Sequence, residues 1–173
     1  MNSDIFVVMG VSGCGKSTVG AQLAEALKLL FLEGDVLHPE CNVARMAAGV
    51  ALSDEDREGW LQALAERLQQ AHAAGQGLVL SCSALKLSYR DILRSGAPSL
   101  HFVYLHGEYK LLAARMAART GHYMPLSLLA SQLATLEAPG SGENVQSFDV
   151  AERPEDIVAA VLAGRHSSAG SAS

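Results

Sequence analysis

The chain has 173 residues, of which 49% are hydrophobic, and it carries a formal net charge of −5 at pH 7. This length fits one domain with a full core, and the negative charge argues against a general surface for nucleic acid or anionic membranes. No apolar run approaches the roughly 20 residues of a membrane-spanning helix. The three cysteines lack C-x-x-C spacing, and the first predicted strand leaves no room for a signal peptide. We therefore expect a cytoplasmic protein without disulfide bonds or a zinc site.

Predicted strands and helices alternate along the whole chain. The strands are short apolar runs at residues 5–9, 30–33, 78–80, 100–105 and 145–150. The helices are predicted at residues 18–27, 39–46, 53–75, 86–94, 108–119, 126–137 and from 154 onward. This alternation predicts an α/β fold in which a five-stranded parallel sheet is covered by helices on both faces, as a three-layer sandwich. We expect one domain over residues 1–165 and a disordered Ser-, Ala- and Gly-rich tail at 166–173.

Residues 10–17 match the phosphate-binding pattern G-x-x-x-x-G-K-[ST], and they lie between a predicted strand and a predicted helix, as that pattern requires. The glycines let successive backbone N–H groups point at an anion, and the start of the helix adds partial positive charge. Lys16 is expected to reach the β- and γ-phosphates, and the Ser17 hydroxyl to bind Mg²⁺. The predicted nucleoside triphosphate site consists of Gly10, Val11, Ser12, Gly13, Cys14, Gly15, Lys16, Ser17 and Thr18.

Polar residues follow the second predicted strand, at the edge where parallel sheets bind ligands. Asp35 could accept a proton from an attacking hydroxyl, orient that hydroxyl or hold a Mg²⁺-bound water, or it could simply cap a turn. The third strand ends without an acid, so Asp35 acting through water is the expected acidic partner of a metal at Ser17. His38 could hydrogen-bond a polyol substrate, or it could be a surface turn residue before Pro39.

Five blocks of the sequence carry a more specific pattern. They are Gly34-Asp35-x-Leu37-His38-Pro39-x-x-Asn42, Leu52-Ser53-Asp54-Glu55-Asp56-Arg57-x-x-Trp60-Leu61, Cys82-Ser83-Ala84-Leu85-Lys86 with Tyr89-Arg90, Arg119-Thr120-Gly121-His122-Tyr123-Met124-Pro125, and Gln132-x-x-x-Leu136-Glu137-x-Pro139. Together they resemble the phosphate-loop gluconokinases of the thermoresistant type, over about residues 5–163. The resemblance implies a nucleoside-monophosphate-kinase-like fold with a helical lid, and usually a homodimer. It implies phosphorylation of D-gluconate at its terminal hydroxyl by ATP and Mg²⁺, which gives 6-phospho-D-gluconate and ADP.

The resemblance also suggests roles for the basic residues. Gluconate carries a carboxylate, which a planar guanidinium binds with two parallel hydrogen bonds. The candidate substrate ligands are Asp35, His38, Arg57, Lys86, Arg90 and His122, although each cation could also be a solvated helix charge. Arg115 and Arg119 are four residues apart and share a helix face that enters a lid at about 115–137. Arg115 would lie against the adenine, and Arg119 would reach the phosphates as the lid closes.

The expected reaction is in-line transfer of the γ-phosphoryl group through a loose transition state. Lys16, Mg²⁺ and Arg119 would stabilise the charge, while Asp35 would organise the hydroxyl and accept its proton. Cys14, at a helix N-terminus beside Lys16, is either a thiol that makes ATP binding sensitive to oxidation or a small residue that fills the loop.

Three other interpretations share parts of this evidence. A shikimate kinase would have the same fold and also bind a hydroxy acid, and a nucleoside-monophosphate kinase would need more arginines than the site region offers. A non-catalytic ATP-binding regulatory module would not need to keep Lys16, Ser17, Asp35 and Arg119 together. Turnover with a panel of acceptors distinguishes these classes.

Overall fold

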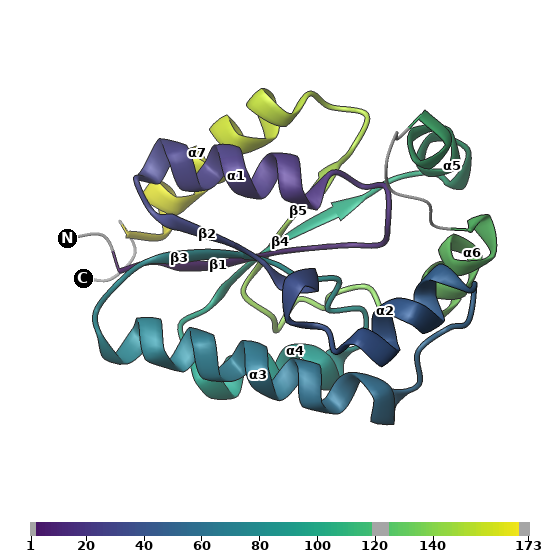
Figure 1. Cartoon of the computed structure of the whole chain (residues 1–173). Coiled ribbons are helices and arrows are strands. Elements are labelled where there is room, and N and C mark those ends of the chain that lie inside the picture. The colour runs from purple at the N-terminus through teal and green to yellow at the C-terminus, as the bar shows by residue number, and fades with distance from the viewer. Residues whose placement is uncertain (1–2, 119–124, 170–173) are drawn as a thin grey trace.

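The structure is a computed structural model that describes residues 3–118 and 125–169, with side chains through Arg165. Five strands form one sheet, with helices on both of its faces (Figure 1). In sheet order the strands are β2 (Leu30–Glu33), β3 (Leu78–Ser81), β1 (Ile5–Met9), β4 (His101–His106) and β5 (Val145–Asp149). Each of the four neighbouring pairs is parallel. The predicted α/β fold, five-stranded parallel sheet and three-layer arrangement are confirmed.

The burial of the strands follows their place in the sheet. Every residue of β1 and β3 is buried, as expected for central strands that helices cover on both faces. The edge strand β2 is less buried, and Leu30 at its start is 72% exposed. On β2, Phe31 packs against Gly20 of α1 (Lys16–Leu27), where an added Cβ would lie 2.6 Å from the Phe31 ring. This close packing fixes α1 over the sheet.

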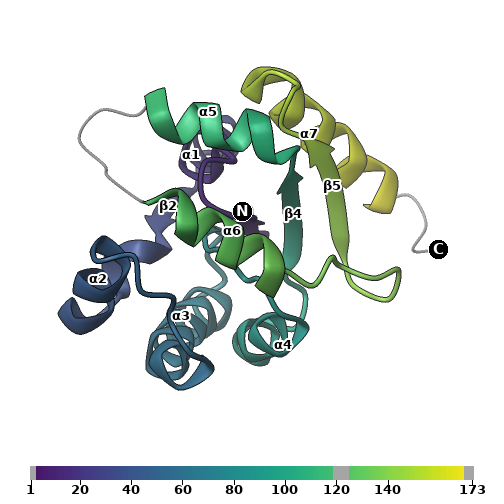
Figure 2. The ribbon, with the colours of Figure 1, turned by 90° about the vertical axis from the view of Figure 1, so that its right-hand side faces the viewer.

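The helices fall into three groups (Figures 1 and 2). One face of the sheet carries α1 and α7 (Pro154–Ala169), and the other carries α3 (Asp54–Ala73) and α4 (Leu87–Gly96). The remaining three lie toward the carboxyl edge of the sheet, which faces the viewer in Figure 2: α2 (Glu40–Ala47), α5 (Tyr109–Ala118) and α6 (Leu126–Thr135). In this arrangement, the carboxyl ends of β1, β2 and β3 lie close to α1, α2 and α3.

Most helix boundaries lie within two residues of those predicted, and two differences bear on the earlier expectations. The helix α7 runs to Ala169 and so overlaps the start of the tail that was expected to be disordered. A 3₁₀ helix, η1 (Gly34–Leu37), follows β2 directly and was not predicted. None of the described helices combines the length and apolar composition that crossing a bilayer requires.

Local sequence signals explain how α3 begins. The Ser53 hydroxyl accepts a hydrogen bond from Asp56 N at 3.1 Å, and Asp56 Oδ2 accepts one from Ser53 N at 2.9 Å. This reciprocal pair is a capping box, with an acid three residues after the serine that caps the helix. Arg45 of α2 also pairs with the Asp56 carboxylate, at 2.9 Å, and so ties α2 to the start of α3.

The approach of η1 to the sheet depends on Gly34. An added Cβ at this position would lie 2.2 Å from the Ser81 carbonyl oxygen, so only glycine lets the chain pass this closely over the end of β3. On the other side, the Trp60 indole N–H donates to the Gly34 carbonyl at 2.8 Å. The segment that carries Asp35 and His38 is therefore fixed between β3 and α3.

Candidate active site

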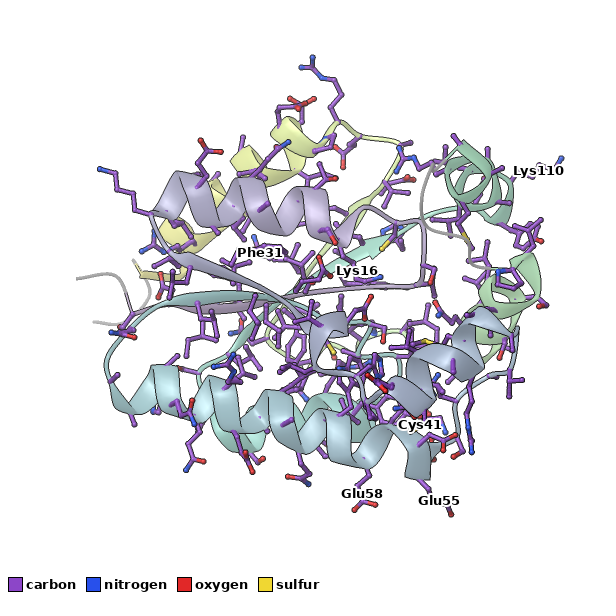
Figure 3. All side chains as sticks on the ribbon, in the orientation of Figure 1. Lys16, Phe31, Cys41, Glu55, Glu58 and Lys110 are labelled. Atoms are coloured by element: carbon purple, nitrogen blue, oxygen red, sulfur yellow. The ribbon has the colours of Figure 1, made fainter. Side chains whose placement is uncertain are left out.

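The phosphate loop connects β1 to α1, and Lys16 stands at its end over the central strands (Figure 3). Gly13 and Gly15 have φ angles of 83° and 89°, in the left-handed region that glycine adopts without strain. Lys16 Nζ donates to the Val11 carbonyl at 3.1 Å across the loop. The loop therefore has the backbone curl and the placement of the cation that phosphate binding requires.

A carboxylate that the sequence analysis did not assign to the site lies beside the phosphate loop. The Ser17 hydroxyl donates to Glu33 Oε2 at 2.5 Å, and the Ser81 hydroxyl donates to Glu33 Oε1 at 2.5 Å. The sequence held a signal for this position of Glu33, because side chains two residues apart along a strand point to the same face of the sheet. Glu33 therefore lies on the same face as Phe31, the face that α1 covers. The acid that the end of β3 lacks is thus present on its neighbour β2.

A cavity of about 240 Å³ opens on the other side of the loop. Gly13, Gly15, Arg115 and Ile157 are among its lining residues. Arg115 Nη2 donates to the Val150 carbonyl at 2.5 Å, so the guanidinium is held at the wall. Arg115 therefore lines a cavity beside the phosphate loop, and its contact with adenine stays a prediction.

Two of the candidate substrate ligands, Arg57 and Lys86, meet in one cluster. Arg57 Nη1 donates to the Tyr89 hydroxyl at 2.9 Å, and Lys86 Nζ donates to Asp54 Oδ1 at 3.0 Å. The Tyr89 hydroxyl in turn donates to Asp54, which connects the two cations. Burial and the Asp54 hydrogen bond raise the pKa of Tyr89, so it stays a neutral donor. The cluster fixes two positive groups at the first turns of α3 and α4.

His38 is half-buried and stacks on Trp60, with ring centroids 3.9 Å apart and planes 15° apart. Burial lowers the pKa of His38 below its ordinary value. The charge of Asp35 works in the opposite direction, while the charge of Arg57 lowers that pKa further. Asp35 is exposed, and its backbone carbonyl accepts a hydrogen bond from His38 N at 3.2 Å.

The elements of the phosphate loop and of the substrate side meet near the end of β3. Burial, above all, raises the pKa of the Cys82 thiol to about 12 at the end of β3. That thiol also senses the charges of Asp35, Lys16 and Arg57. The elements that carry these residues, η1, α1 and α3, are joined near the carboxyl ends of β2 and β3 by the hydrogen bond from Ser17 to Glu33 and by that from Trp60 to the Gly34 carbonyl.

Arg90 does not join this group. Its side chain is 1% exposed and donates to both carboxylate oxygens of Glu143 and to the carbonyls of Ala84, Leu85 and Glu137. All five N–H donors of the guanidinium are thus used within the protein. Burial works against ionisation of Glu143, but the hydrogen bonds from Arg90 and Arg94 lower its pKa to about 2. Arg90 therefore holds α4 to the segment after α6 and has no donor left for a substrate.

The lid expected at about 115–137 is described only in part. Arg119 and His122 lie outside the described residues, which resume before α6. Within α6, Gln132 Oε1 accepts a hydrogen bond from the Ser12 backbone N–H at 2.7 Å. This contact joins α6 directly to the phosphate loop, across 120 residues of sequence.

The donor set at Ser17 fits Mg²⁺. This ion prefers oxygen ligands and keeps several waters, so it is bound through a few protein groups together with substrate phosphates. A hydroxyl and a carboxylate in contact, as at Ser17 and Glu33, provide such groups. No cluster of three or more His, Cys, Asp or Glu side chains that could hold a metal occurs among residues 3–118 and 125–165.

A glycine loop that ends in lysine and serine, between β1 and α1 of a parallel sheet, defines a P-loop nucleotide-binding protein. The family model described as an AAA domain matches residues 5–139. A gluconokinase from Gluconobacter oxydans (strain 621H) is 47% identical over 152 residues, which cover 88% of this chain and 85% of that protein. The thermoresistant gluconokinase of Escherichia coli (strain K12) is 42% identical over 159 residues, 91% of each chain.

A solved structure agrees with these relatives. The crystal structure of a gluconokinase from Sinorhizobium meliloti 1021 matches with a TM-score of 0.85 and 51% identity, over 94% of this chain and 91% of that one. The chain belongs to the gluconokinase family. The resemblance drawn from the five sequence blocks is confirmed.

Proposed function

We propose that this protein transfers the γ-phosphoryl group of ATP to the terminal hydroxyl of D-gluconate, giving 6-phospho-D-gluconate and ADP. The observation that carries the proposal is that the elements bearing Lys16, Asp35 and Arg57 are joined near the ends of β2 and β3, by the hydrogen bonds Ser17–Glu33 and Trp60–Gly34. The first residue belongs to the phosphate loop and the other two to the substrate side. The high identity to gluconokinases over nearly the whole chain supports the choice of acceptor.

ATP binds along the phosphate loop, with its phosphates on the backbone N–H groups of residues 10–18 and on Lys16. The cavity beside Gly13 receives the base, and Arg115 forms part of its wall. Arg119 approaches the phosphates from the lid, as the sequence predicts. The hydrogen bond from Ser12 N to Gln132 supports this arrangement, because it joins α6, part of the expected lid, to the phosphate loop.

Ser17 and Glu33 would hold the Mg²⁺ that accompanies ATP, and the ion would neutralise charge on the phosphates. Glu33 takes over the metal role that the sequence analysis gave to Asp35. Asp35 is then free to orient the attacking hydroxyl and accept its proton.

Gluconate lies between Asp35 and the Arg57–Lys86 cluster. Because the transition state is loose, catalysis depends mostly on positioning and charge stabilisation, which Lys16 and Arg119 supply. Arg57 and Lys86 are preoriented by Tyr89 and Asp54 to bind the substrate carboxylate. His122 remains a predicted substrate ligand.

The test is an ADP-release assay with Mg-ATP and four acceptors in parallel: gluconate, shikimate, AMP and glucose. Turnover with gluconate alone supports the proposal. Turnover with another acceptor would support the assignment of the ATP site but refute the assignment of the substrate side. ATP binding without turnover on any acceptor favours the regulatory module instead.

The homodimer implied by the family resemblance and the cytoplasmic location are further parts of the proposal. The described cysteines, Cys14, Cys41 and Cys82, are all free, which fits a reducing compartment. Light scattering after size-exclusion chromatography tests the assembly. A homodimer gives twice the 18.2 kDa of one chain.

A further inference from the structure

The side chain of Asn42, on α2, is buried between two groups that belong to other elements. Asn42 Nδ2 lies 2.8 Å from the Asp56 carbonyl oxygen and 3.3 Å from His38 Nδ1. Asn42 is 2% exposed, which makes it one of the few buried polar residues of the described chain. A buried carboxamide needs partners for its donors, and these two atoms provide them.

The Asp56 carbonyl determines which way the carboxamide faces. A backbone carbonyl can only accept a hydrogen bond, so the NH₂ group of Asn42 must face it. If the carboxamide were turned over, two acceptor oxygens would meet at hydrogen-bonding distance. The nearby Cys41 thiol is placed to donate to Asn42 Oδ1, at 3.8 Å, which fits the same orientation.

The second hydrogen of this NH₂ group determines the protonation of His38. Nδ1 can accept that hydrogen only if it carries no proton itself, so the proton of the neutral ring is on Nε2. The stacking of the ring on Trp60 fixes its plane. Among the described residues, Nε2 has no hydrogen-bond partner, so its N–H is available to a ligand.

We infer that Asn42 is a positioning residue that holds His38 as the neutral Nε2–H tautomer, and that His38 donates this hydrogen to an oxygen of the phosphoryl acceptor. The inference rests on the proposed function, and it deepens the account of that site. His38 then has no free lone pair, since Nδ1 is occupied and Nε2 is protonated. It therefore contributes to acceptor binding, while proton removal belongs to Asp35.

The groups around His38 favour the neutral ring on balance. Burial and the positive charge of Arg57 oppose protonation, while the exposed carboxylate of Asp35 favours it. Asn42 opposes it as well, because a proton on Nδ1 would face the NH₂ group. Acidification that protonates His38 should therefore break its hydrogen bond with Asn42 and leave ATP binding unchanged.

The direct test is long-range ¹H–¹⁵N NMR of the full chain labelled with ¹⁵N-histidine. The His38 signals are identified as those missing from His38→Gln, because the chain has six histidines. At pH 8 we expect a neutral ring with the proton on Nε2. A proton on Nδ1, or a doubly protonated ring, would overturn the inference. This measurement does not depend on turnover, so it remains valid if the acceptor is not gluconate.

Kinetics provide the second test. Asn42→Ala should raise KM for gluconate about tenfold, as expected for one lost hydrogen bond, with little change in kcat or in KM for ATP. His38→Phe keeps a ring for Trp60 but removes the donor, and it should show the same effect. His38→Gln, which offers an amide N–H, should recover part of the affinity. Equal KM values for His38→Phe and His38→Gln would contradict a donor role.

Discussion

The Ser17 hydroxyl donates a 2.5 Å hydrogen bond to Glu33, which connects the end of β2 to the phosphate loop. The two residues lie 16 positions apart, and β3 separates β2 from β1, the strand that leads into the phosphate loop. The same carboxylate accepts a hydrogen bond from Ser81 of β3. Glu33 is thus held by two hydroxyls beside the place where the phosphates of ATP are expected.

The first prediction concerns Glu33→Gln. The amide oxygen can still accept one hydroxyl, so the fold should persist, but the negative charge that attracts Mg²⁺ is lost. We expect the Mg²⁺ concentration for half-maximal activity to rise about 10- to 100-fold. The measurement is initial rate against Mg²⁺ concentration. Glu58→Gln is the control, because Glu58 points away from the site on α3 (Figure 3). A wild-type Mg²⁺ curve for Glu33→Gln would remove Glu33 from the metal site.

The second prediction concerns the substrate carboxylate. Arg57→Gln removes a charged donor, and a hydrogen bond to a charged group contributes about 1.5–3 kcal/mol. KM for gluconate should therefore rise about 10- to 100-fold, while KM for ATP stays within about twofold. Arg67→Gln, an exposed position on the same helix, is the matched control. Equal effects of both substitutions would show that only general charge matters.

The third prediction concerns the proton acceptor. Asp35→Asn keeps the size of the side chain but removes its basicity, so kcat should fall about 100-fold, at the low end for general bases. The fall is limited because charge stabilisation carries most of the catalysis. Single-turnover rates at saturating Mg²⁺ test this without interference from metal binding. Turnover near that of the wild type would rule out Asp35 as the base, and Asp91→Asn controls for loss of an exposed carboxylate.

The fourth prediction concerns stability and pH. The pKa of Glu143 in the folded protein is about 2, below its ordinary value near 4.5. The stabilisation from its ionised form is therefore complete above about pH 4.5 and is lost as the pH falls toward 2. Glu143→Gln should lower the free energy of unfolding at pH 7 by about 3 kcal/mol, because it leaves Arg90 buried without its counter-charge.

Urea unfolding at pH 7, 4 and 3 measures this effect. The difference between wild type and Glu143→Gln should shrink as the pH falls. A constant difference would show that the Arg90–Glu143 pair does not titrate as described. The KM for gluconate of the folded variant should stay near that of the wild type, since Arg90 has no donor free for substrate.

Local signals in the sequence predicted most of the architecture. The capping box at Ser53 and Asp56 involves residues three apart, and the pattern of the phosphate loop is contiguous. Such features depend on neighbours in the chain, so no knowledge of the strand order was needed. The tertiary surroundings of Glu33 and Arg90 were not accessible in this way.

Arg90 was expected to bind substrate because it follows the third strand and lies in a matched block. Its burial depends on Glu143 and on the carbonyl of Glu137, which are 53 and 47 residues away. Glu33 was passed over because the order β2–β3–β1 cannot be obtained from the order of the strands along the chain. In both cases the decisive partner comes from a distant segment.

The most direct test of the central claim is to identify the product. The wild-type protein is incubated with Mg-ATP and ¹³C-labelled gluconate, and the product is examined by ³¹P and ¹³C NMR. Our account predicts one phosphate ester, on the terminal carbon, formed in equal amount to ADP. ADP release without a phosphate ester, or a phosphate on another carbon, would contradict it.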